Sequence, residues 1–271
     1  MAKVIVVTSG KGGVGKTTST AAIGAALAQS GQSVAVVDFD VGLRNLDLVM
    51  GAERRVVYDL INVVQGAVKL QQALIRDKRV DTLFLLPASQ TRDKDALTED
   101  GVARVIAELR EKFDWVICDS PAGIERGATL AMRHADAAVI VTNPEVSSVR
   151  DSDRIIGLLD SKTEKAEKGE RIDKHLLIAR YDVARATRGE MLTIEDVLEI
   201  LSIPLLGIIP ESEDVLRASN LGSPVTISST ASAAARAYQA AARRLCGEDV
   251  AMTIPNDRKS LLDRLLRRRA A

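Results

Sequence analysis

The sequence is poor in the residues that build metal clusters and membrane spans. Its 271 residues include two cysteines and two histidines. Cys118 and Cys246 lie in different segments, with no pair spacing typical of a zinc site or an iron–sulfur cluster. His134 and His175 stand alone, so we expect structural rather than catalytic roles for them. No apolar run approaches the roughly 18 residues that a membrane-spanning helix needs. A globular protein is therefore expected.

The chain also lacks a net charge, but its charges are unevenly distributed. Cationic and anionic side chains number 37 each, and 46% of the residues are hydrophobic. Residues 256–271 hold six cations against two anions, a net of +4, so the rest of the chain carries −4. A polyanion would therefore meet the C-terminal end rather than the body. Because no signal peptide is recognisable, we expect a reducing cytosolic setting.

A glycine-rich stretch near the N-terminus matches the phosphate-binding pattern G-x-x-x-x-G-K-[ST] through Gly10, Gly15, Lys16 and Thr17. An apolar run precedes it and a helical pattern follows it, which is the context that such a loop requires. The glycines let several backbone N–H groups face one anion at the start of a helix. Lys16 is predicted to neutralise the β- and γ-phosphates of ATP, and the Thr17 hydroxyl to bind Mg²⁺.

The predicted ATP-binding loop covers residues 10–18. Its members are Gly10, Lys11, Gly12, Gly13, Val14, Gly15, Lys16, Thr17 and Thr18.

Short apolar runs alternate with helical patterns along the chain. The runs cover residues 4–7, 34–37, 83–86, 115–118, 137–141, 176–178 and 205–209. Runs that are apolar at every position are typical of parallel strands covered on both faces. Helical patterns cover about 17–30, 97–112, 149–160, 193–201 and 232–245. This alternation predicts a doubly wound α/β domain, with a mostly parallel sheet and helices on both faces, over residues 1–254.

Two of these runs end in carboxylates, on the side of the sheet where ligands of such folds bind. Asp119 follows the fourth run and is predicted to support Mg²⁺ through water in the coordination shell. Asp38 and Asp40 follow the second run. The pattern alone does not say which of these two lies near the metal and which positions the attacking water.

The base of the nucleotide is expected near the ends of the last two strands. Arg180 and Pro210 are the candidates for contacts with it, although ordinary strand ends would look the same in the sequence. The mixed-sign charged run at residues 162–174 is expected to form a solvated loop.

A second lysine, Lys11, distinguishes the loop from a generic phosphate loop, which needs only one. The stretch KGGVGKTT resembles the deviant Walker A motif of the MinD/ParA ATPases, a family of P-loop NTPases. Further blocks resemble its MinD branch rather than ParA proteins. They are VDFDVGLRNLD (37–47), LRNLDLVMGAERRVVYDL (43–60), LPASQTRDKDALT (86–98), CDSPAGIE (118–125), NPEVSSVRDSDRI (143–155) and IPESEDVLRASN (209–220).

The resemblance implies roles for individual residues. Lys11 matches the lysine that reaches across a dimer to the partner's nucleotide, and it joins Lys16 and Asp40 as the catalytic set. Asp40 matches the aspartate that orients the hydrolytic water, which leaves Asp38 for the metal site with Thr17 and Asp119. The resemblance also places Asn45 at the dimer interface. A partner-binding surface is implied at Arg44, Glu53, Arg54, Arg55, Asp151, Asp153 and Arg154.

The last segment, residues 255–271, is predicted to be an amphipathic membrane-targeting helix. Leu261, Leu262, Leu265 and Leu266 form one apolar stripe flanked by cations, a pattern typical of a helix lying in a membrane interface. A terminal helix packed on the body is the alternative. MinD proteins end in such a sequence, but this one contains no phenylalanine or tryptophan. A single tail is expected to bind lipid weakly, and two tails on one dimer to bind with avidity.

The resemblance implies an ATPase that positions the bacterial division septum. With ATP and Mg²⁺ it would form a homodimer on anionic phospholipid, peripheral on the cytoplasmic face of the inner membrane. It would recruit MinC there and be released after MinE-stimulated hydrolysis. The alternative is a ParA-like DNA-partitioning ATPase. The net charge of −4 on residues 1–255 argues against nonspecific DNA binding by the body, so no nucleic acid is expected as a partner.

Overall fold

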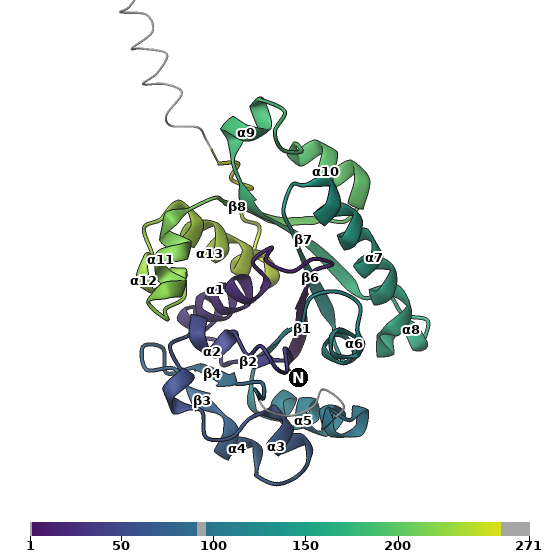
Figure 1. Cartoon of the computed structure of the whole chain (residues 1–271), viewed down its shortest axis with the longest axis vertical. Coiled ribbons are helices and arrows are strands. Elements are labelled where there is room, and N and C mark those ends of the chain that lie inside the picture. Colours follow the sequence, from purple (N-terminus) through teal and green to yellow (C-terminus); the bar gives the residue numbers. More distant parts are fainter. Residues whose placement is uncertain (1, 91–95, 256–271) are drawn as a thin grey trace, which may run out of the picture.

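A computed structural model describes residues 2–90 and 96–255, and its core is an eight-stranded sheet (Figure 1). The strand order is β3-β4-β2-β5-β1-β6-β7-β8. Every neighbouring pair is parallel except β3 and β4, which are antiparallel. The bounds are β1 (Lys3–Thr8), β2 (Val34–Asp38), β3 (Ile75–Arg76), β4 (Leu83–Leu86), β5 (Trp115–Asp119), β6 (Ala137–Thr142), β7 (Asp173–Tyr181) and β8 (Leu205–Pro210). The predicted doubly wound, mostly parallel sheet is confirmed.

Helices cover both faces of the sheet. One face carries α1 (Lys16–Gln29), α2 (Leu46–Val49), α11 (Glu213–Asn220), α12 (Val225–Ser228) and α13 (Ala233–Leu245). The other carries α3 (Leu60–Val64), α4 (Leu70–Ala73), α5 (Glu99–Lys112), α6 (Arg126–Arg133), α7 (Val146–Lys162), α9 (Val183–Thr187) and α10 (Ile194–Leu201). The short η1 (Glu53–Arg55) follows α2, and α8 (Glu164–Glu167) packs beside α7.

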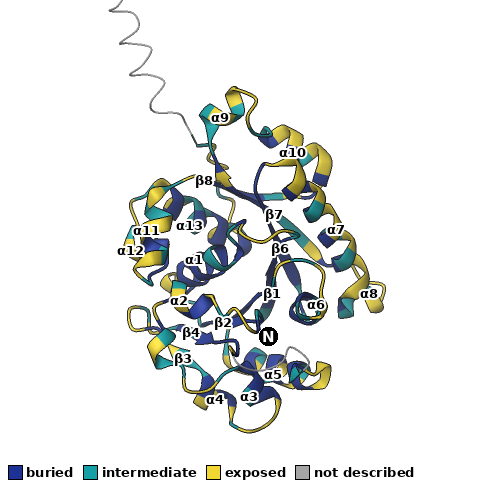
Figure 2. Cartoon of the chain, viewed as in Figure 1, coloured by how far each residue is buried: buried dark blue, intermediate teal, exposed yellow. Residues whose placement is uncertain are grey.

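Burial on both faces explains why the strands are apolar at every position. In β1, Val4 and Val6 belong to the core on one side of the sheet, and Ile5 and Val7 to the core on the other. The central strands are accordingly buried, whereas much of α9 and α10 is exposed (Figure 2). Gly24 brings α1 close to the sheet, because a Cβ at this position would lie 2.7 Å from Cγ1 of Val36.

The prediction of a solvated loop at residues 162–174 is wrong. The segment contains α8, whose first turn is capped by the Thr163 side chain accepting from the Ala166 N–H. Two anions of α8 pair with cationic or titratable side chains at the end of α6: Glu167 with Arg133 at 2.8 Å and Glu164 with His134 at 2.9 Å. These side-chain contacts join α8 to a distant element, and a local pattern does not record them.

Candidate nucleotide-binding site

The loop between β1 and α1 has the backbone that a phosphate cradle requires. Gly13 and Gly15 adopt positive φ angles of 78° and 100°, a region that L side chains rarely adopt. Gly15 lies directly before α1, so the unpaired N–H groups of the helix's first turn face the loop. A Cβ built on either glycine meets no atom within 4 Å, which leaves open space along this part of the loop.

Gly10, the first glycine of the loop, is required by its close packing against α7 rather than by its own backbone dihedral angles. A Cβ at Gly10 would lie 2.2 Å from the backbone oxygen of Asp151 in α7. The loop therefore rests directly on the backbone of α7, and any side chain at position 10 would separate them. Asp151, which the resemblance places on a partner-binding surface, thus also contacts the phosphate loop through its backbone.

Asp38 and Asp119 lie side by side at the ends of β2 and β5, where they are direct neighbours in the parallel register. Both are buried. Burial, and then repulsion from Asp119, raises the pKa of Asp38 well above its ordinary value, against hydrogen bonds from the backbone N–H groups of Asp40 and Leu46. Burial raises the pKa of Asp119 to about 6, although hydrogen bonding and the charge of Lys16 oppose the shift. The raised pKa values mean that this buried pair resists carrying two negative charges without a cation nearby.

Lys16 lies close to this pair of carboxylates and is 8% exposed. Burial lowers the pKa of its ammonium group, while the charges of Asp119 and Asp40 raise it. The Asp119 carboxylate also accepts a hydrogen bond from the Thr20 hydroxyl at 3.0 Å, and the nearby Thr17 hydroxyl helps to lower its pKa. The structure therefore brings the predicted Lys16, Thr17, Asp38, Asp40 and Asp119 to one place.

A nucleotide with magnesium fits this arrangement. The loop leaves space at a helix N-terminus beside a buried lysine, which suits phosphate groups. A divalent cation would relieve the repulsion between Asp38 and Asp119. Residues 2–90 and 96–255 contain no group of three or more His, Cys, Asp or Glu side chains arranged to hold a metal. Mg²⁺ commonly combines one or two carboxylates with phosphate oxygens and water, which agrees with this sparse donor set.

Lys11, the predicted cross-dimer lysine, pairs within its own chain in this structure. Its ammonium group lies 3.3 Å from Oε2 of Glu145 and 3.1 Å from Oγ of Ser147, at the start of α7. The side chains of Lys11 and Glu145 are 43% and 49% exposed, so the ion pair lies in solvent. An exposed pair of this kind contributes at most about 1 kcal/mol and can be exchanged for another partner.

A cavity of about 270 Å³ adjoins the phosphate loop on the side of β7 and β8. It is lined by Gly13, Val14, Gly15, Thr18, Ala179, Arg180, Ile209, Pro210, Glu211, Ser212, Val215, Leu216, Ser219 and Tyr238. Both predicted base-contact residues thus lie at its wall. Arg180 has a positive φ of 58° and its guanidinium lies 3.1 Å from Glu211.

Several contacts at the site were not predicted from the sequence. Thr20 binds Asp119, Glu145 binds Lys11, and Ser19 shares a 3.1 Å hydroxyl–hydroxyl hydrogen bond with Tyr238 of α13. The helical pattern after the loop places Thr20 one turn beyond Lys16, and this spacing was the only local indication that Thr20 faces the site. The other two contacts join segments more than 100 residues apart, and no local pattern records them.

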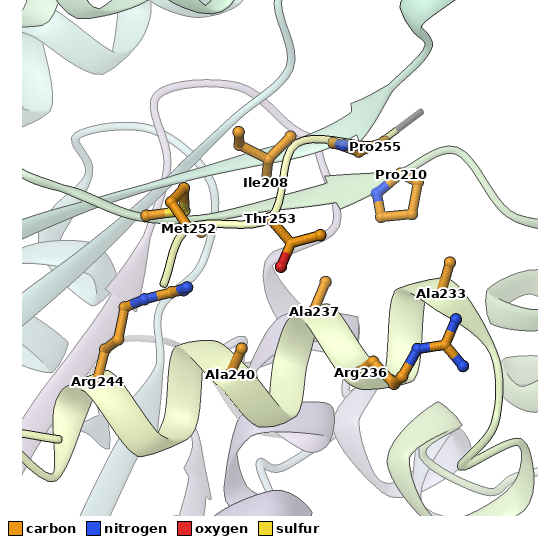
Figure 3. A pocket seen from close by; sticks show the side chains of 11 residues that line it. Ile208, Pro210, Ala233, Arg236, Ala237, Ala240, Arg244, Met252, Thr253 and Pro255 are labelled. Carbon is orange, nitrogen blue, oxygen red and sulfur yellow. The ribbon is translucent and has the colours of Figure 1, made fainter. Parts of the chain in front are cut away.

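The predicted tail lies outside the described residues, and so do Leu261, Leu262, Leu265 and Leu266. Its starting point is nevertheless fixed. Arg244 of α13 donates to the backbone oxygens of Leu206, Val250 and Ala251 at 2.7, 2.9 and 2.7 Å, which holds the chain after α13 beside β8 (Figure 3). Pro255 and Pro210 both line a pocket between β8 and α13 (Figure 3). In the part of the chain that the structure describes, no helix is long and apolar enough to cross a membrane.

The sheet, the loop and the buried lysine beside paired carboxylates define a P-loop nucleotide-binding protein. Residues 5–225 match the family described as the CobQ/CobB/MinD/ParA nucleotide binding domain. A septum site-determining protein MinD from Neisseria meningitidis is 60% identical over 98% of this chain and 99% of its own. The MinD from Escherichia coli K12 is 59% identical over 98% of this chain and 99% of its own. The chain belongs to the CobQ/CobB/MinD/ParA family and, within it, to the MinD proteins.

Solved structures agree with this assignment. A MinC:MinD cell division protein complex from Aquifex aeolicus has a TM-score of 0.82 and 42% identity, over 95% of this chain and 99% of that one. A MinD complexed with Mg-ADP from Pyrococcus horikoshii has a TM-score of 0.80 and 30% identity, over 90% of this chain and 96% of that one. A ParA family ATPase from Chlorobium tepidum is 21% identical and shares the fold.

Proposed function

We propose that the chain is an ATPase that dimerises around two Mg²⁺·ATP and binds anionic membrane through residues 255–271. The observation that carries the proposal is the convergence of Lys16, Asp40, Asp38 and Asp119 beside the phosphate loop, in a chain of the MinD family. On the membrane it would recruit MinC and be released after hydrolysis stimulated by MinE, and so position the division septum. The known complex of a related MinD with MinC supports this partner.

Each side chain of the site has a task in this account. Bound Mg²⁺ would neutralise phosphate charge, with Thr17, Asp38 and Asp119 as the side chains that hold it. Lys16 stabilises charge that develops on the β- and γ-phosphate oxygens. Asp40 orients the attacking water by accepting a hydrogen bond from it. Lys11 leaves Glu145 and reaches the partner's nucleotide, so that hydrolysis depends on dimer formation.

The nucleotide site is tested by Lys16→Ala. The variant is expected to lose at least about tenfold in ATP affinity, because one charge-assisted contact to phosphate is removed. The measurement is equilibrium binding of a fluorescent ATP analogue with Mg²⁺. Lys112→Ala in α5, an exposed residue remote from the loop, is the matched control and should bind as the wild type does. Equal affinity of Lys16→Ala and wild type would contradict the assignment of the site.

A DNA-partitioning role is separated from this function by a direct binding measurement. The chain truncated after Pro255 carries a net charge of −4 and is expected not to retard nonspecific duplex DNA, with or without ATP. Salt-sensitive retardation by the truncated chain would favour the DNA-binding alternative.

A further inference from the structure

Arg79, in the turn between β3 and β4, lies at a junction of three segments that are distant in the sequence. Its Nη1 donates to the backbone oxygen of Gly222 at 3.1 Å, and its Nη2 to that of Met50 at 3.0 Å. The same guanidinium binds Asp77 through Nε at 3.2 Å and Nη2 at 2.7 Å. Arg79 therefore ties the turn to the end of α2 and to the connection between α11 and α12.

The two segments that Arg79 joins are in direct backbone contact. Gly51 and Gly222 both have positive φ angles, 64° and 61°. A Cβ on Gly51 would lie 2.4 Å from the Gly222 oxygen, and one on Gly222 would lie 2.7 Å from the Gly51 Cα. No side chain fits between them, so a displacement of either segment is passed directly to the other.

Asp77, the anchor of this junction, is buried and hydrogen-bonded on several sides. Asp77 is 3% exposed and accepts hydrogen bonds from the backbone N–H groups of Arg79 at 2.7 Å and Val80 at 3.2 Å. Burial on its own would raise the pKa of Asp77, but the hydrogen bonds and charge of Arg79 outweigh it and hold that pKa below its ordinary value. The guanidinium is therefore fixed in one orientation by an ionised partner.

One side of the junction leads to the carboxylates of the nucleotide site. Asp38 accepts from the backbone N–H of Asp40 at 2.8 Å and from that of Leu46, the first residue of α2, at 3.2 Å. The four-residue helix α2 then runs directly to Met50, whose backbone oxygen Arg79 binds. The backbone of Asp40 is thus linked to Arg79 through the Asp38 carboxylate and the short helix α2.

The other side leads to the predicted base cavity. Gly222 follows α11, and its backbone N–H donates to the Ser219 oxygen at 3.1 Å. Ser219 and Leu216 of α11 line the cavity. A ligand in this cavity would press on α11, and through its end on Gly222.

We propose that Arg79 is a positioning residue that couples occupation of the cavity beside α11 to the orientation of the segment bearing Asp38 and Asp40. The inference rests on the proposed function, because it assumes that a nucleotide occupies the cavity and that Asp40 acts in hydrolysis. It adds a residue with no nucleotide contact of its own to the machinery of the site.

The test compares Arg79→Gln with Arg76→Gln in the full chain. Arg76 lies in the same hairpin and pairs with Asp81, but both side chains are exposed, at 61% and 78%, so it is a matched control. Amide hydrogen exchange is followed with and without Mg-ADP. In the wild type and Arg76→Gln, Mg-ADP should protect residues 10–18, 213–223 and 40–51. In Arg79→Gln the first two segments should stay protected, and residues 40–51 should lose their protection.

Steady-state kinetics give a second readout of the same variants. Arg79→Gln is expected to lower kcat about fivefold or more and to leave KM within about twofold of wild type. A fivefold effect is at the lower end of the usual range for coupling between two sites. Protection of residues 40–51 that persists in Arg79→Gln would overturn the proposal. A wild-type chain in which Mg-ADP protects none of the three segments would instead overturn the proposed function.

Arg79→Lys keeps the test decisive if Arg79→Gln does not fold. Lysine retains the charge opposite Asp77, but one ammonium group cannot replace the planar fork that serves Asp77, Met50 and Gly222 together. A folded Arg79→Lys should show the same selective loss of protection in residues 40–51. If its exchange pattern and kcat match those of the wild type, the coupling role of Arg79 is wrong.

Discussion

At the scale of single residues, the site concentrates charges that the fold must otherwise separate. Asp38 and Asp119 are buried together, and Asp40 lies close enough that its charge acts on both Asp119 and Lys16. Such an arrangement costs stability in the free protein and becomes favourable when a cation and phosphate arrive. The roles of the individual carboxylates can therefore be separated by substitution.

Asp40→Ala is expected to bind ATP nearly as the wild type does and to hydrolyse it about 10²-fold more slowly or worse, because positioning and proton acceptance by one side chain contribute on that scale. Nucleotide binding and single-turnover hydrolysis, measured on the same preparation, separate the two effects. Normal hydrolysis by Asp40→Ala would remove the water-positioning role from this residue.

Lys11→Ala is expected to retain ATP binding but to lose ATP-dependent dimerisation, because we propose that Lys11 reaches the partner's nucleotide. Light scattering coupled to size exclusion measures the dimer. Glu145→Gln is the matched control, since it removes the same intrachain ion pair and leaves Lys11 in place. Its dimer should survive. Dimerisation of both variants at the wild-type level would exclude the cross-dimer role.

At the scale of elements, the strands could be predicted from the sequence, and much of the helical layer could not. All seven apolar runs lie within strands, because burial on both faces leaves a local and continuous signal. The eighth strand, β3, has two residues and leaves none. The short helix α2 and the charged helix α8 were not predicted from the sequence either, because contacts with distant side chains stabilise them.

The same distinction applies to the candidate site. The motif around Lys16 and the carboxylates at strand ends could be located, because parallel strands bring their ends to one edge. The contact of Gly10 with Asp151 and the junction of Arg79 with Gly222 depend on how separate elements pack. Those contacts required the three-dimensional structure.

The burial of His134 at the end of α6 predicts a pH dependence of stability. Burial lowers the pKa of His134 below its ordinary value, although Glu164 opposes the shift. The unfolded chain, with an imidazole pKa of about 6.5, then binds the proton more readily than the folded one. The stabilisation that depends on neutral His134 is present above that pH and is lost as the pH falls through the folded pKa.

The measurement is the free energy of unfolding of wild type and His134→Gln at pH 8 and pH 5. The wild type should lose stability relative to the variant on acidification, because glutamine does not titrate. A difference that stays constant, or that shifts in favour of the wild type at pH 5, would contradict the assigned direction of the His134 pKa shift.

At the scale of the whole molecule, a candidate nucleotide site at one edge of the sheet is combined with a basic C-terminal segment. Arg244 fixes the chain beside β8, so the predicted tail starts from a defined point on the body. Partial burial of four leucines would contribute about 4–6 kcal/mol. Ordering a dozen residues costs about 1 kcal/mol each. Each cation near anionic lipid contributes about 1 kcal/mol in favour of binding. One tail is then near balance, and two tails on a dimer bind with avidity.

The central claim is that ATP switches membrane binding through the dimer. Its most direct test is co-sedimentation of the full chain with anionic liposomes in ATP, ADP or no nucleotide, beside a chain truncated after Pro255. We expect the full chain to pellet with liposomes only when ATP is present, and the truncated chain to stay in solution under all three conditions. Equal sedimentation of the full chain with and without ATP, or sedimentation of the truncated chain, would contradict it.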